Sequence, residues 1–82
     1  MATVLVRFWA GAHRAAGHAE ESLAAVDVGS LRALLAARPP LERVCEVATF
    51  LVDEVPASDT TVLRDGAVVD VLPPFAGGSA PP

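Results

Sequence analysis

Hydrophobic residues gather in short runs that are separated by polar and glycine-containing segments. The first run, Thr3 to Trp9, is nearly continuous in apolar, β-branched and aromatic residues, which is typical of a strand buried on much of both faces. The last run, Ala67 to Leu72, has the same character and ends at Pro73-Pro74, because proline cannot donate to a strand ladder. We therefore expect these two runs to be central strands that lie side by side.

Weaker patterns lie between these two strands. Ala10 to Ala19 contains two glycines and two histidines and predicts a loop or a short helical turn. Glu20 to Val26 predicts an edge strand paired with the first strand, and Ala48 to Asp53 predicts a further strand. Glu54 to Thr61 is expected to be a polar connection, and Leu63 to Gly66 a turn whose glycine takes a positive φ at little cost.

The main helix is predicted to begin after a capping side chain. Either Asp27 or Ser30 can accept a hydrogen bond from the unpaired amides of the first helical turn. Leu31, Leu34 and Leu35 follow at i, i+3 and i+4, which predicts one apolar stripe facing the sheet. The helix is expected to run for about three turns.

A proline pair marks the end of this helix. Pro39-Pro40 stops it because neither residue can donate a backbone hydrogen bond, and Arg38 suits the negative end of the helix dipole. Leu41, Val44 and Cys45 predict a second, shorter helix in which the cysteine is a small buried hydrophobe. The order strand, strand, helix, strand, strand predicts an α+β fold, the β-grasp or ubiquitin-like fold, in which one main helix packs across a mixed sheet.

Length and charge restrict the classes of function. A chain of 82 residues supports a single small domain, which we expect to be a β-grasp domain over residues 1–74 and a flexible tail over residues 75–82. The net charge of −4 argues against a nucleic-acid partner, which requires a basic face, and favours a basic protein partner. No apolar run reaches the ~18 residues of a membrane span, so we expect no membrane partner.

Two residue counts add to this picture. Cys45 is the only cysteine, which excludes an internal disulfide and suits a reducing compartment. Together with an N-terminus that lacks a signal-peptide pattern, it predicts a cytoplasmic protein. All six basic residues are arginine, so the chain has no side-chain amine.

Side chains that could carry out chemistry are few and poorly placed. His13 and His18 lie on a glycine-containing segment without the spacing of metal ligands. The adjacent carboxylates Glu20-Glu21 and Asp53-Glu54 point to opposite faces of a strand, so neither pair can converge on one bond, and both pairs are expected to be solvated. We expect no catalytic residue, no metal site and no bound cofactor, so the protein is not an enzyme.

The C-terminal tail is the most distinctive stretch. Pro73-Pro74 forces an extended exit from the sheet, and Ala76 and Gly77-Gly78 have so little bulk that the backbone can enter a narrow channel. Phe75 either anchors a partner or folds back onto the sheet edge. From Pro74 to Gly78 the chain can span at most about 17 Å, enough to reach into a partner's active site.

Three stretches resemble one known family: VLVRFWAGAHRAAG, DVGSLRALLAARPP and VLRDGAVVDVLPPFAGG. They are similar to the MoaD/ThiS family of ubiquitin-like sulfur carriers, in particular its molybdopterin synthase small-subunit branch, over residues 3–78. The last stretch is the most specific, because the family also has an Asp-Gly turn, a hydrophobic strand, a proline pair and a diglycine in this order. One departure is Asp53-Glu54, where the family often has an Asn-Gly-like turn.

The resemblance implies a carrier whose reactive group is the carboxylate of Gly78. An E1-like adenylyltransferase uses ATP to adenylate this carboxylate, and sulfur then displaces AMP to leave a thiocarboxylate. A sulfur-acceptor synthase in molybdopterin, thiamine, cysteine or thiolated-metabolite biosynthesis receives the sulfur. Because Gly78 is held in an amide bond to Ser79, the extension 79–82 must first be removed, and a metal-dependent protease of the deubiquitinase type is implied.

Two other functions are compatible with the sequence. A ubiquitin-like protein modifier would be joined through Gly78 to lysines on its targets, although without lysine it could not build isopeptide-linked chains on itself. Alternatively, the domain is a plain β-grasp interaction module whose last residues are a disordered end.

Overall fold

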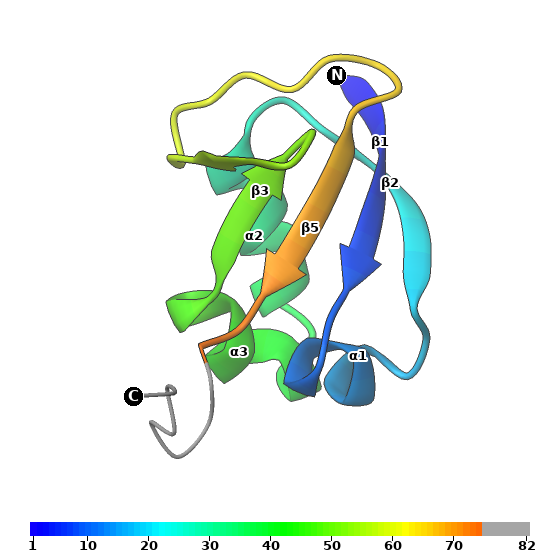
Figure 1. Cartoon of the computed structure of the whole chain (residues 1–82), viewed down its shortest axis with the longest axis vertical. Helices are drawn as coiled ribbons and strands as arrows, with labels where there is room; N and C mark the ends of the chain where they lie inside the picture. The colour runs from blue at the N-terminus through cyan, green and yellow to red at the C-terminus, as the bar shows by residue number, and fades with distance from the viewer. Residues whose placement is uncertain (75–82) are drawn as a thin grey trace.

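Five strands form one mixed sheet in the order β2-β1-β5-β3-β4. The computed structural model describes residues 1–74, and its strands are β1 (Ala2–Phe8), β2 (Glu20–Ala25), β3 (Thr49–Val52), β4 (Val55–Ala57) and β5 (Val68–Leu72). The central pair, β1 and β5, is parallel, and the other neighbouring strands are antiparallel. Figure 1 shows β5 in the middle of the sheet. The predicted pairing of the first and last strands, and the edge position of β2, are therefore confirmed.

Three α-helices and one 3₁₀ turn complete the domain. They are α1 (Gly11–Ala16), α2 (Val28–Ala36), η1 (Pro39–Leu41) and α3 (Glu42–Val47). In Figure 1, α2 crosses behind the sheet, and α1 and α3 lie at the end of the molecule toward which β1 and β5 run. The segment after β1 is thus a helical turn rather than a loop, and the second short helix lies where it was predicted. None of the helices within residues 1–74 is long and apolar enough to cross a membrane.

The hydrophobic core lies between α2 and one face of the sheet. Val6 in β1, Val69 in β5 and Phe50 in β3 are fully buried there. On the opposite face of β1, Thr3 is exposed and Arg7 is half-buried. The expectation that β1 is buried on both faces was wrong, because the helices cover only one face of the sheet.

The start and the stripe of α2 differ in part from expectation. Asp27 is the N-cap, and its Oδ1 accepts a hydrogen bond of 2.7 Å from the Ser30 amide. Leu31 and Leu35 are fully buried, but Leu34 is 44% exposed, so its assignment to the apolar stripe was wrong. The buried stripe begins instead at Val28, because the sheet contacts the side of the helix that carries positions i, i+3 and i+7.

The end of α2 precedes the proline pair. The helix stops at Ala36, and Arg38 has an extended backbone, which is the conformation that a following proline favours. The prediction that Arg38 complements the negative end of the helix dipole was therefore wrong. Its guanidinium instead binds both carboxylate oxygens of Glu21, with 2.7 Å from Nη1 to Oε1.

This ion pair corrects the assignment of Glu21 as a solvated charge. The Glu21 side chain is 21% exposed and also lies 2.7 Å from His18 Nε2. The hydrogen bond from Arg38 lowers the pKa of Glu21 to about 2, against the opposing effect of burial. The contact ties the edge strand β2 to the segment after α2.

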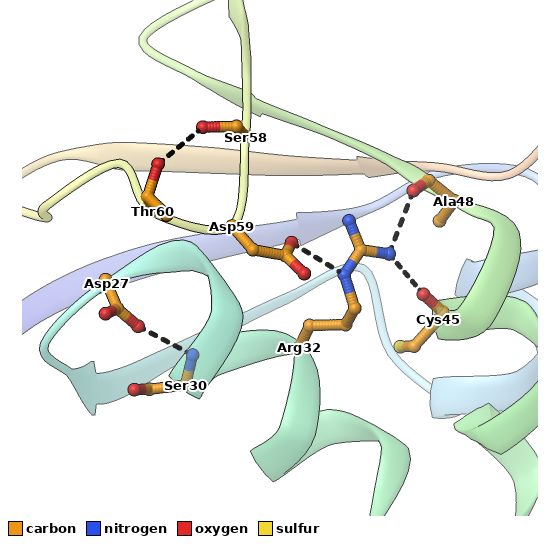
Figure 2. Close-up of polar contacts among 8 residues, drawn as sticks. All are labelled: Asp27, Ser30, Arg32, Cys45, Ala48, Ser58, Asp59 and Thr60. Atoms are coloured by element: carbon orange, nitrogen blue, oxygen red, sulfur yellow. Dashed lines mark hydrogen bonds and ion pairs between the residues drawn. The ribbon is translucent and has the colours of Figure 1, made fainter.

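Arg32 fastens α2 to two other segments, as Figure 2 shows. Its guanidinium donates to the Cys45 carbonyl, to the Ala48 carbonyl at 3.1 Å and to Asp59 Oδ1 at 3.0 Å. It also lies 4.4 Å from the centre of the Phe50 ring, close enough for a cation–π interaction. One side chain thus positions both the end of α3 and the loop before β5.

A hairpin lies where a polar connection was predicted. Val55–Ala57 pairs with β3 as strand β4 through a two-residue turn at Asp53 and Glu54, which have φ angles of 49° and 71°. Positive φ at both central residues is the requirement of a type I′ hairpin turn. The hairpin was missed because the chain lacks the Asn-Gly pair that normally announces it. Asp53 is also not simply solvated, since its Oδ1 accepts from the Val68 amide at 3.0 Å.

Candidate functional site: the tail exit

The central strand β5 leads directly to the proline pair. Leu72 and Pro73 are half-buried, and Pro74 is exposed at the surface. Of the predicted site residues, only Pro74 belongs to the part of the chain that the structure describes. The others, Phe75, Ala76, Gly77 and Gly78, and the predicted cleavage partner Ser79, lie outside the described residues. The site is therefore built from what surrounds Pro74.

A groove of about 710 Å³ lies beside the proline pair, and we call it the tail-exit groove. Three segments that are distant in the sequence line it: the link from β1 into α1, the outer face of α3 and the end of β5. Its residues are Trp9, Ala10, Gly11, Arg14, Arg43, Val44, Val47, Leu72, Pro73 and Pro74. Most of this lining is apolar, so the surface suits a binding partner rather than solvent.

Trp9 is the largest side chain of the groove, and three contacts hold it. It follows β1 directly, and its backbone amide donates to the Val71 carbonyl at 3.3 Å. Its indole Nε1 donates to Asp70 Oδ1 at 2.9 Å, and the Arg7 guanidinium lies 5.8 Å from the ring centre. The ring nevertheless remains 47% exposed. A fixed, half-exposed tryptophan is the kind of side chain that dominates protein interfaces.

Asp70 is the buried acceptor at the centre of this arrangement. It lies opposite Arg7 in the parallel pair of β1 and β5 and is only 3% exposed. Arg7 donates to it from Nε at 2.6 Å and from Nη2 at 2.9 Å. These hydrogen bonds, followed by that from Trp9, hold the pKa of Asp70 below its ordinary value despite burial.

Sequence reasoning did not single out Arg7, Trp9 or Asp70 as site residues. The available signal was a lone carboxylate inside the apolar run Val68 to Leu72, since an unpaired charge there would be costly. Its partners are 61 and 63 residues away in the chain, however, and only the register of β1 against β5 brings them together.

The backbone at Ala10 is strained. This residue has φ 49° and ψ −123°, a conformation that normally requires glycine. The strained turn directs the chain from the sheet into α1, at whose start the Ala12 amide donates a hydrogen bond of 2.9 Å to the Trp9 carbonyl. It thereby places the start of α1 along the groove.

The titratable side chains near the groove form no reactive centre within residues 1–74. His13 is exposed, and His18 packs edge-on against Phe8 at 5.6 Å. Cys45 is buried, as predicted, and burial raises the pKa of its thiol. Over the described range, no group of three or more His, Cys, Asp or Glu side chains could hold a metal ion. What this region offers is a shaped surface beside the exit of the chain.

The fold and the exit together define a class of protein. A five-stranded mixed sheet crossed by one main helix, with its central strand leading into a C-terminal diglycine segment, is the arrangement of a ubiquitin-like β-grasp protein. The predicted fold class is confirmed. The chain belongs to the ThiS family, whose sequence profile matches residues 6–78. The resemblance to the MoaD/ThiS ubiquitin-like sulfur carriers is thereby confirmed as well.

Several solved structures share this fold over nearly the whole chain. A chain from the complex of subunits 1 and 2 of the molybdopterin-converting factor of Helicobacter pylori is 28% identical, with a TM-score of 0.72, and the match covers 93% of this chain and 99% of that chain. Small archaeal modifier protein 1 from Methanosarcina acetivorans is 26% identical, with a TM-score of 0.79 and coverage of 95% and 98%. A putative molybdopterin-converting factor subunit 1 from Pyrococcus furiosus is 25% identical, with a TM-score of 0.78 and coverage of 92% and 100%. A search of curated protein sequences gives no match.

Proposed function

We propose that this protein carries sulfur as a thiocarboxylate on Gly78, after removal of residues 79–82. The observation that carries the proposal is the exit of the chain from the central strand at Pro74. The five residues from Pro74 to Gly78 can span at most about 17 Å, so Gly78 can reach into a partner's active site. The family match, which extends to residue 78, supports placing the reactive end there and not at Pro82.

Sulfur transfer then proceeds through two displacements. The Gly78 carboxylate attacks the α-phosphorus of ATP on an E1-like adenylyltransferase, which forms an acyl adenylate and releases pyrophosphate. Sulfide attacks the acyl carbon and AMP leaves, which gives the thiocarboxylate directly. If the donor is a persulfide, the same attack forms an acyl disulfide, and a second thiol then cleaves its S–S bond to release the thiocarboxylate and form a disulfide with the donor. ATP is bound by the activating partner and not by this chain. The first step needs a free carboxylate, so the amide bond from Gly78 to Ser79 must be hydrolysed beforehand, and a metal-dependent protease of the deubiquitinase type fits that task.

The likeness to molybdopterin-converting factor chains favours a molybdopterin-type synthase as the sulfur acceptor. Enzymes of thiamine, cysteine or thiolated-metabolite biosynthesis are the other acceptor classes. In each case the carrier supplies the sulfur and the arm, and the acceptor supplies the catalytic groups.

Intact-mass measurement tests the proposal. The chain ending at Gly78 and the full chain are each incubated with an E1-like adenylyltransferase, ATP and a sulfur donor. We expect the shorter chain to gain the mass of one sulfur in place of one oxygen, and the full chain to gain nothing. Equal sulfur incorporation into the full chain would overturn the precursor step, and no incorporation into either would overturn the carrier function.

A second candidate function is protein modification, which the likeness to small archaeal modifier protein 1 favours. The same activated Gly78 would then be joined to lysines of target proteins. Because this chain has no lysine, only single attachment is expected. A ladder of lysine-linked conjugates in the same incubation, supplemented with host protein extract, would identify the modifier.

A further inference from the structure

We propose that the tail-exit groove docks a protein segment that combines an aliphatic or aromatic side chain with flanking carboxylates. The segment would belong to the enzyme whose active site the tail enters, and in this respect the inference rests on the proposed function. Two features of the groove point to such a segment: its apolar floor and the two arginines beside it.

The floor of the groove is apolar and prearranged. Trp9 is held by its hydrogen bond to Asp70, and it remains half-exposed. Val47 at the end of α3 also lines the groove and is 62% exposed, and the lining residues Val44 and Leu72 are half-buried. A side chain entering here would remove apolar surface from water without first having to order the tryptophan, which favours binding.

Two arginines line this apolar floor. Arg14 in α1 and Arg43 in α3 are both exposed, and the Arg14 guanidinium lies close to the start of its own helix, with Nη2 3.7 Å from the position a Cβ would take at Gly11. Neither arginine makes an ion pair or a side-chain hydrogen bond within residues 1–74.

Three other arginines, in β1, in α2 and just after α2, are already neutralised. Arg7 is paired with Asp70, Arg32 with Asp59, and Arg38 with Glu21. The unpaired positive charge next to the groove thus contrasts with the net charge of −4 over the whole chain. Guanidinium groups bind carboxylates with paired hydrogen bonds. The net charge alone predicts a basic partner, but the charge at this groove selects an acidic segment.

Peptide titration followed by ¹⁵N–¹H correlation spectroscopy tests this inference on the full chain. The probe is the acetylated and amidated peptide Glu-Glu-Leu-Phe-Glu-Glu, and its control is Lys-Lys-Leu-Phe-Lys-Lys. We expect the acidic peptide to shift the amides of Trp9, Arg14, Val44 and Val47, and the basic peptide to leave them in place. Higher salt should weaken the acidic peptide's binding, because exposed charges are screened.

Charge variants make the test specific. Arg14→Gln combined with Arg43→Gln should lower the affinity for the acidic peptide roughly tenfold, because the loss of two exposed charge pairs removes binding free energy of that size. Arg64→Gln is the control for each single substitution: like Arg14→Gln or Arg43→Gln alone, it removes one exposed arginine without an ion pair among the described residues, but before β5, at the opposite end of that strand. It should leave the affinity of the peptide unchanged.

Four results would overturn the inference. Equal binding of the basic peptide, or full affinity in the double variant, would show that charge does not select the occupant. If Phe75→Ala by itself shifts the groove amides of the full chain, the groove is occupied by the chain's own tail. If these amides shift with protein concentration, the occupant is a second copy.

The outcome is independent of sulfur chemistry, because no activating enzyme or sulfur donor takes part. A chain that gains sulfur but binds no acidic peptide overturns the docking inference alone. A chain that binds the peptide but never gains sulfur overturns the proposed function alone.

Discussion

Replacing Asp70 with asparagine removes the charge that joins β1, β5 and the tryptophan of the groove. The variant keeps the size of the side chain, but it leaves Arg7 without a counter-charge and can present an NH₂ group to Trp9 Nε1. Hydrogen bonds to a charged group contribute about 1.5–3 kcal/mol each, and loss of one partner of a buried pair costs about 3–5 kcal/mol. The Arg7 side chain is 32% exposed, so water can hydrate its guanidinium and reduce this cost.

We therefore expect Asp70→Asn to lower the free energy of unfolding by about 2–3 kcal/mol. In a domain of this size, that corresponds to a fall in Tm of about 10–20 °C. Urea unfolding followed by circular dichroism measures the first quantity, and calorimetry measures the second. Trp9 is the only tryptophan in the chain, so a red shift of its fluorescence in the native state would report its release from Asp70.

Asp59→Asn is the matched control. It also neutralises an aspartate paired with an arginine, but Asp59 is 57% exposed, and Arg32 keeps its hydrogen bonds to Cys45 and Ala48. We expect its effect to stay within about 0.5 kcal/mol. If the two variants lose the same stability, the buried cluster does not contribute as the structure indicates.

The pH dependence gives a second check on Asp70. Its pKa is lowered from 3.8 in the folded chain, chiefly by the hydrogen bonds from Arg7. A lowered carboxyl pKa means that the stabilisation is present above the ordinary pKa and is lost as pH falls through the native pKa. The stability difference between the native chain and Asp70→Asn should therefore shrink below pH 3.8. A constant difference down to acid unfolding would contradict the assignment.

Three further predictions test other parts of the molecule. Ala10→Gly should raise the free energy of unfolding by about 1 kcal/mol, because glycine relieves the positive φ at that turn at a smaller entropic cost; a lower Tm in calorimetry would argue against strain there. Glu21→Gln should lower the free energy of unfolding by about 1 kcal/mol at pH 7. In the native chain, the stabilisation from the ion pair with Arg38 should be lost as pH falls from 4.5 to about 2. Acid titrations should show this loss in the native chain and not in the variant. Arg43→Lys, in the chain ending at Gly78, should yield an internal amide when the chain is incubated with ATP and an E1-like adenylyltransferase but no sulfur donor, because the new amine beside the groove attacks the acyl carbon of Gly78 and AMP leaves. Mass spectrometry detects this product as the loss of one water. The native arginine is not nucleophilic, and the same product from Arg64→Lys would refute the role of position.

Local patterns in the sequence were sufficient for most of the elements, namely β1, β2, β3, β5, α2 and α3, and for their order along the chain. Runs of β-branched residues predicted β1 and β5, a capping Asp27 or Ser30 followed by a stripe of leucines predicted α2, and the proline pair predicted the exit of the chain. The turn glycine Gly66 has φ 85°, as was predicted. Each of these features depends on residues a few positions apart, where periodicity, capping and fixed φ angles act directly.

Two features of the fold could not be predicted in this way. The β3–β4 hairpin was missed because its turn uses Asp53 and Glu54 at positive φ without a glycine. Leu34 was wrongly assigned to the buried stripe because the position of the sheet, and not the helix period alone, decides which side of α2 is buried.

The sequence by itself determined a β-grasp chain that leaves its central strand through a proline pair toward a diglycine. Only the tertiary structure decided what surrounds that exit. The register of β1 against β5 places Asp70 beside Arg7 and Trp9, and the packing of α1 and α3 places Arg14 and Arg43 along one groove. The physical reason is that these partners are far apart in the chain, and their pairing is set by strand register and helix packing, which local periodicity does not encode.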